Sequence, residues 1–223
     1  MRYPGLNALL SDPFAPVHGN TFVWKGFAYK VVVRDYGANG KLAWLDRNLG
    51  ASRAAQSRLD SLSFGGFYQW GRLTDGHQLP DSATTSTLAT SDVPDNDGKF
   101  ITTSAAPNDW RDPQNDNLWQ GADGTNNPAP PGWRVPTQTE ANREIALWDS
   151  EDFNGAYDSA LKLPTTGGRG LNGSAVLTDR GYIWLSTTIN TNSRMLDYRS
   201  NLAQTSGQQF RAVGYPVRCV RTI

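Results

Sequence analysis

The chain has 223 residues, enough for one large or two small domains, and 38% of them are hydrophobic, which is enough for a sizeable core. The formal net charge is zero, which argues against a nucleic-acid binder and gives no electrostatic attraction to an anionic membrane. The single cysteine, Cys219, excludes an internal disulfide framework, and no apolar run approaches the length of a membrane span.

Residues 1–20 predict an N-terminal arm, because Pro4, Pro13 and Pro16 interrupt regular structure between small apolar residues. The arm could dock on its own domain or on a neighbouring subunit. The first residues lack the pattern of a secretory signal peptide. If Met1 is the true start, we expect synthesis in a cytoplasm and, if the protein leaves the cell, a route other than secretion.

Strand-forming residues dominate the next segments. Residues 20–34 predict a β-hairpin with its turn at Lys25 and Gly26, and residues 42–47 predict a third short strand.

The segment 52–62 predicts a helix capped by Ser52. Three apolar residues share one face of this expected helix: Ala55, Leu59 and Leu62. Phe67 and Trp70 are expected to enter the core beside it.

Residues 79–132 have little periodicity and predict a long loop. Within residues 98–140, however, Trp110, Trp119 and Trp133 stand among Asn, Asp, Gly and Pro. Large apolar side chains of this kind are not typical of a flexible linker. We therefore predict an irregular segment that is pinned to the core by tryptophans.

A capping box gives the clearest helix signal. Thr137 is placed to cap a helix, and Glu140 follows three residues later. One apolar face then follows the helical repeat: Ala141, Ile145 and Trp148.

Short strands return in the last third of the chain, at residues 182–188, 194–200 and 215–221. In the second of these, Leu196 and Tyr198 alternate with three residues that point to the opposite face: Met195, Asp197 and Arg199. No boundary divides residues 21–223, so we expect a single α+β domain with two helices, short antiparallel strands and long irregular loops.

Catalytic chemistry has weak support. Cys219 could act as a nucleophile with His18 or His77 as its base, but its alternating surroundings favour a packed strand cysteine. The acidic cluster of Asp149, Glu151 and Asp152 is explained by a solvated helix end.

The metal reading is also weak. Asp92, Asp95 and Asp97 only faintly resemble a calcium loop, lack a following bidentate Glu and fit an Asx-rich turn better. Neither a P-loop nor a dinucleotide fingerprint is present. We predict no cofactor and no metal.

Residues 190–210 are almost entirely Asn, Gln, Thr, Ser, Tyr and Arg with a few larger side chains, a composition found in antibody paratopes. Composition alone would favour an ordinary polar loop. Met195 favours binding, because an exposed methionine is unusual without a partner.

A series of motifs resembles the Fibrobacter succinogenes major paralogous domain family, which overlaps the variable proteins of diversity-generating retroelements. The motifs are LDRNLGA (45–51), YQWGRLTDGH (68–77), KFIT (99–102), DWRDPQNDNLWQG (109–121), NNPAPPGWRVPTQTE (126–140), LKLPTTGGR (161–169), YIWLSTT (182–188) and GYPVRCV (214–220). The resemblance implies a C-type-lectin-like fold from about Trp44 onward.

The chain departs from related families in two ways. It lacks the EPN and WND motifs and the paired cysteines of calcium-dependent lectins, which disfavours calcium-dependent sugar binding. Cys219 alone cannot supply the cysteine pair of formylglycine-generating enzymes, which disfavours an enzyme of that type.

The resemblance also implies a division into fixed scaffold and varied surface. The expected scaffold residues are Trp184, Ser186, Thr187, Arg194, Leu196, Tyr198, Arg211, Gly214, Val217 and Arg218. The expected ligand-binding residues are Leu185, Met195, Asp197, Arg199, Asn201, Gln208, Gln209, Phe210, Val213 and Tyr215. We expect the second set on an exposed face, with Phe210 and Tyr215 close to the strand at 194–200.

The resulting hypothesis is a non-enzymatic receptor-binding protein at the tip of a phage tail fibre, within the virion. A host-cell protein or glycan would be its receptor, and the arm at 1–20 would attach it to other tail proteins. Trimers are common at fibre tips, which favours a homotrimer. The alternative is a surface or secreted bacterial adhesin, and an enzyme that has borrowed the fold is a third possibility.

Overall fold

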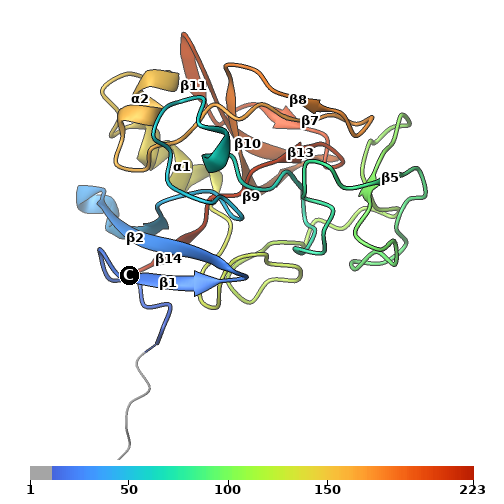
Figure 1. Ribbon diagram of the computed structural model, residues 1–223, viewed down its shortest axis with the longest axis horizontal. Helices are drawn as coiled ribbons and strands as arrows, with labels where there is room; N and C mark the ends of the chain where they lie inside the picture. The colour runs from blue at the N-terminus through green and yellow to red at the C-terminus, as the bar shows by residue number, and fades with distance from the viewer. Residues whose placement is uncertain (1–11) are drawn as a thin grey trace, which may run out of the picture.

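The computed structural model describes residues 12–223, so the first part of the predicted arm, including Pro4, lies outside the described residues. The described chain has a mixed but strand-rich fold with two short helices and several antiparallel sheets (Figure 1). This agrees with the expected α+β class.

One sheet joins the beginning of the described chain to its end. Its strand order is β1 (Thr21–Trp24), β2 (Phe27–Asp35), β3 (Lys41–Leu45) and β14 (Val220–Thr222). The predicted hairpin is confirmed, and its turn places Lys25 and Gly26 at positive φ, as a tight two-residue turn requires. The predicted third strand is also present, within slightly earlier bounds.

A second sheet contains the C-terminal strands that carry most of the candidate site. Its long strand β10 (Asn192–Arg199) pairs with β9 (Gly181–Ile189) on one edge and with β11 (Leu202–Gln204) and β12 (Gln208–Gln209) on the other. The strands predicted at 182–188 and 194–200 are therefore confirmed.

Two smaller sheets hold the middle of the chain. One has the order β4 (Tyr68–Gln69), β13 (Gly214–Tyr215), β7 (Gly168–Arg169) and β8 (Ala175–Val176). The other is a parallel pair, β5 (Thr84–Thr85) with β6 (Phe100–Ile101). The last predicted strand, 215–221, is divided between β13 and β14, which belong to different sheets.

The helix predicted from the capping box is α1 (Gln138–Ile145), and both hydrogen bonds of the box are present between Thr137 and Glu140. Ala141, Ile145 and Trp148 are all buried, as the helical repeat predicted. No helix among residues 12–223 is long and apolar enough to cross a membrane.

The second helix, α2 (Phe153–Asp158), was not predicted. Its N-cap is Asp152, whose carboxylate accepts hydrogen bonds from the backbone N–H groups of Asn154 and Gly155. The acidic cluster therefore marks a helix start.

The predicted helix at 52–62 is absent, and turns with a 3₁₀ segment (Ser61–Ser63) take its place. The buried carboxylate of Asp60 accepts hydrogen bonds from the Arg53 side chain and from the backbone N–H groups of Gln56 and Leu62. These bonds offer the backbone an alternative to helical pairing. Phe67 and Trp70 are buried as expected, but not beside a helix.

Tryptophans fix the long loop to the core, as predicted. Trp110, Trp119 and Trp133 are completely buried. Their indole nitrogens donate to the backbone oxygens of Trp70 (2.6 Å), Arg72 (3.2 Å) and Phe14 (2.9 Å), respectively. Each ring therefore contributes apolar burial and also satisfies its one polar atom.

The described part of the arm packs on its own domain. Phe14 makes an edge-to-face contact with Phe22, with the ring centroids 5.1 Å apart. Arg221 in β14 donates to the Phe14 carbonyl and forms an ion pair with Asp12 at 2.7 Å. The beginning and end of the described chain are thereby held together.

Candidate functional site

The register between β9 and β10 sorts the candidate residues between two faces. Leu196 and Tyr198 belong to the core cluster that contains α1 residues. On the other face, Met195 stands opposite Trp184, and Asp197 stands opposite Tyr182. The predicted alternation along this strand is therefore correct.

The expected exposure of that second face is wrong for Met195 and Asp197, which are both buried. The loop between β11 and β12 covers Met195, because a Cβ placed on Gly207 would lie 2.8 Å from its terminal methyl group. Asp197 accepts two hydrogen bonds of 2.6 Å from Arg180 and a third from Gln204. Alternation assigns a side chain to a face but does not tell whether another segment covers that face.

Tyr215 lies close to this strand, as expected, but in a buried position. Its ring stacks on Tyr182 at 4.3 Å with an angle of 11° between the planes, and burial raises the pKa of its hydroxyl. Five of the ten candidate binding residues are buried in this way: Leu185, Met195, Asp197, Val213 and Tyr215. They contribute to the layer beneath any surface formed here.

The other five candidates form what we call the β10 surface: Arg199, Asn201, Gln208, Gln209 and Phe210. Asn201, Gln208 and Phe210 are exposed, whereas Arg199 and Gln209 are half-buried. Arg199 and Asn201 lie at one end of β10, and β12 pairs with its other end at Ser193 and Arg194. At the rise of an extended strand, the two groups are roughly 17 Å apart.

The expected scaffold residues are mostly buried, with Thr187 and Arg194 half-buried. Trp184 is completely buried and donates from its indole nitrogen to the Tyr68 carbonyl at 2.7 Å. Arg211 stacks over the Trp70 ring at 4.7 Å, and Arg218 donates to Asn48 and two backbone carbonyls. These side chains fix the C-terminal strands to the first half of the chain.

Two groups considered for catalysis, Cys219 and His77, are buried within the fold. Cys219 is completely buried, and burial raises the pKa of its thiol. Burial lowers the pKa of His77 to about 4. The His77 ring lies between the Asp75 carboxylate, 2.5 Å from Nδ1, and the backbone N–H of Gln69, which donates to Nε2 at 3.0 Å.

One of the three carboxylates considered for calcium, that of Asp92, is engaged by a basic group and an amide group. Arg111 forms an ion pair with Asp92 at 2.9 Å, and Asn115 donates to the same carboxylate. Among residues 12–223, no three His, Cys, Asp or Glu side chains are grouped to hold a metal ion.

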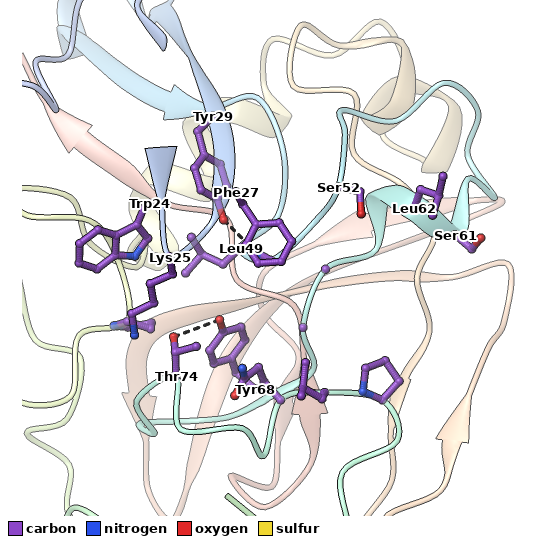
Figure 2. Close-up of a pocket in the computed structure, with 17 residues that line it drawn as sticks. Trp24, Lys25, Phe27, Tyr29, Leu49, Ser52, Ser61, Leu62, Tyr68 and Thr74 are labelled. Atoms are coloured by element: carbon purple, nitrogen blue, oxygen red, sulfur yellow. Dashed lines mark hydrogen bonds between the residues drawn. The ribbon is translucent and has the colours of Figure 1, made fainter. Parts of the chain in front are cut away.

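A pocket that no sequence pattern indicated opens beside the β1–β2 turn (Figure 2). Its volume is about 360 Å³, which lies within the size range of small-molecule sites. Four aromatic residues from β1, β2 and β4 line this aromatic pocket: Trp24, Phe27, Tyr29 and Tyr68. Three loops complete it, at residues 49–52, 61–66 and 74–80, together with Pro128.

Some polar groups of the aromatic pocket bond to one another. The Tyr29 hydroxyl accepts from the Gly50 amide at 2.9 Å, and the Tyr68 hydroxyl lies 3.2 Å from Thr74 Oγ1. The buried indole N–H of Trp24 is different, because it has no hydrogen-bond partner among the described residues.

No protein-family model, no curated protein and no solved structure matches the chain.

Proposed function

We propose that the chain is a non-enzymatic receptor-binding domain with a C-type-lectin-like fold. It would act at the tip of a phage tail fibre and bind a protein or glycan on the host cell. The motif resemblance motivates this proposal, and the mixed, strand-rich fold with two short helices and long pinned loops is compatible with it. The proposal includes attachment to tail proteins through residues 1–20 and assembly as a homotrimer.

One observation carries the choice of binding face. Around β10, a buried layer that includes the ion pair between Asp197 and Arg180 supports polar and aromatic side chains that reach solvent. A site on a strand with a locked supporting layer is positioned more precisely than one on a free loop. Arg199, Gln208 and Phe210 offer a charge, an amide and an aromatic ring for recognition, and Arg and aromatic residues are enriched at binding hot spots.

The experiment compares two triple variants for adhesion to intact bacterial cells. Arg199→Ala, Gln208→Ala and Phe210→Ala remove side chains of the β10 surface. The matched control removes side chains that are exposed on β3, on α1 and after it: Lys41→Ala, Thr139→Ala and Leu147→Ala. Replacing Met195 or Asp197 would be a poor test, since both are buried and their loss would disturb folding.

We expect the native chain and the control variant to adhere equally to at least one strain of a panel of candidate hosts. The β10 variant should fold, as judged by circular dichroism, and lose at least about tenfold in affinity. A folded β10 variant with native affinity would show that the binding face lies elsewhere, with the pinned loop at 98–132 as the next candidate. Failure of the native chain to adhere to any strain would contradict the proposal itself.

The runner-up is a bacterial surface or secreted adhesin with the same binding face. The two settings differ in what the soluble domain inhibits. A phage protein should block adsorption of its own phage to the host, whereas an adhesin should block attachment of the bacterium that makes it.

A further inference from the structure

We propose that the aromatic pocket is a second binding site, for a small planar aromatic molecule with one carboxylate. The site is separate from the β10 surface, and no residue is shared between the two sets. It therefore does not depend on the function proposed above.

The walls of the pocket favour a flat apolar body. Trp24, Phe27, Tyr29 and Tyr68 converge on it from three strands, and Leu49 contributes an aliphatic contact (Figure 2). Aromatic rings gain from stacked or edge-to-face contacts in addition to the burial of their apolar area. At the mouth, Leu62 and Leu79 are each 51% exposed, so the apolar lining continues to solvent.

Backbone contacts shape the wall of the pocket, because glycines let two loops approach closely. Gly66 donates its amide to the Leu49 carbonyl at 2.9 Å. A Cβ on Gly65 would lie 2.5 Å from that same carbonyl oxygen, and Gly65 also has a φ of +73°. A Cβ on Gly66 would lie 2.7 Å from the Gln78 side chain. Larger residues at either position would disturb this part of the wall.

Two unpaired donors at one end select the charge of the ligand. The Lys25 ammonium lies 5.7 Å from the centre of the Trp24 ring and forms no ion pair within residues 12–223 (Figure 2). The Trp24 indole N–H is buried without an acceptor in the described chain. A ligand carboxylate at this end would pair with the Lys25 ammonium, and a small movement of the Trp24 ring would let it accept from the indole N–H as well, which recovers part of the desolvation cost of that donor.

Carboxylates of the protein do not compete for this end. Among the described residues, none of those that line the pocket carries a carboxylate. The nearby carboxylate of Asp75 acts on Lys25 only at longer range. Its own oxygens bind Arg72 at 2.6 Å and His77 at 2.5 Å.

The same arrangement disfavours other classes of ligand. Aromatic pockets can bind quaternary ammonium groups through ring faces. Here Lys25 already stands over the Trp24 ring and would repel a second cation. A neutral aromatic amide would keep the stacking contacts and lose the charge interaction.

The experiment uses three probes of similar size: naphthalene-2-carboxylate, naphthalene-2-carboxamide and (2-naphthylmethyl)trimethylammonium. Binding to the full chain is measured by isothermal titration calorimetry and by ligand-detected nuclear magnetic resonance. We expect one molecule of the carboxylate per chain, with the amide at least about tenfold weaker and the ammonium weaker still.

Two variants locate the binding. Lys25→Met should abolish the preference for the carboxylate over the amide, while Lys30→Met, a matched change of an exposed lysine on β2, should retain it. Ser52→Trp introduces a large ring at the pocket wall and should abolish binding of both probes. The triple variant of the β10 surface should bind the carboxylate normally.

Three outcomes would overturn the proposal. They are absence of carboxylate binding to the native chain, equal affinity for all three probes, and carboxylate binding that persists in a folded Ser52→Trp variant. The Ser52→Trp test remains informative if Lys25→Met fails to fold, because it changes a different wall of the pocket.

Discussion

At the scale of single residues, buried charges in this chain are matched by several donors or acceptors. Asp197 binds Arg180 and Gln204, and Glu144 accepts from Arg34, Tyr36 and Trp148. An isolated buried charge is costly, so removal of either carboxylate leaves its donors without partners.

Asp197→Ala is expected to lower the free energy of unfolding by about 1–3 kcal/mol, far more than an ordinary surface substitution. The loss is below that of a fully buried pair, because the Arg180 side chain is one-third exposed and regains hydration. Urea denaturation monitored by tryptophan fluorescence measures the change. Asn201→Ala, an exposed neighbour, serves as the control and should change stability by no more than about 0.5 kcal/mol. Equal effects of the two variants would contradict the assigned burial.

The lowered pKa of His77 predicts that the free energy of unfolding declines under mildly acidic conditions. Its folded pKa of about 4 lies below the ordinary value of 6.5, so the unfolded chain binds a proton more readily between these values. The stabilising contribution is complete above pH 6.5 and is lost as the pH falls toward 4, by up to about 3 kcal/mol. Below that range, the lowered pKa of Asp75 adds a further loss.

Urea denaturation at several pH values between 7 and 4.5 measures this dependence. A His77→Gln variant keeps a donor and an acceptor at this position but does not titrate. Its stability should vary less over the same range. An equally steep decline in both proteins would assign the proton uptake to another group.

At the scale of elements, local hydrogen bonds decide where helices form. Thr137 and Asp152 each cap a helix, whereas Asp60 binds backbone groups in a way that replaces one. An acidic or hydroxyl side chain near an apolar repeat thus favours opposite outcomes, depending on which N–H groups it reaches.

Thr137→Ala is expected to destabilise the chain by about 1 kcal/mol, because the N–H group of Glu140 loses its side-chain acceptor. Thr139→Ala alters an exposed threonine inside the same helix and should change stability much less. Thermal unfolding of both variants tests the prediction. A larger loss for Thr139→Ala would mean that the cap contributes little here.

Much of the fold could be predicted where the determining contacts are local. The turn at Lys25 and Gly26, the capping box and the alternation along β10 involve residues within a few positions of one another. The burial of Met195 and Asp197 depends on segments that fold back over the strand, so alternation alone could not reveal it. The aromatic pocket joins β1 to Tyr68 and Pro128, which no short pattern connects.

At the scale of the whole molecule, the tryptophans determine the shape of the long irregular region. Trp133 is completely buried, bonds to the Phe14 carbonyl and lies 5.9 Å from the Phe22 ring. A single side chain thus connects the pinned loop, the arm and the first sheet.

Trp133→Ala should cost about 3–5 kcal/mol and make the loop at 79–132 sensitive to proteolysis under native conditions. Limited digestion followed by mass spectrometry identifies the cleavage sites. Leu147→Ala, at a 43% exposed position, is the control and should leave the digestion pattern unchanged. Resistance of the loop in the Trp133→Ala variant would show that other contacts suffice to hold it.

The ion pair between Asp12 and Arg221 lies where the beginning and the end of the described chain meet. The chain leaves the first sheet, passes through every other element and returns to the same sheet through β14 (Figure 1). Because the two side chains are 2.7 Å apart, a short linker could join the region of Arg221 to Asp12 in a chain that begins at Asp12. In such a circular permutant the order of elements along the chain would change, while the neighbours of each strand in space would stay the same.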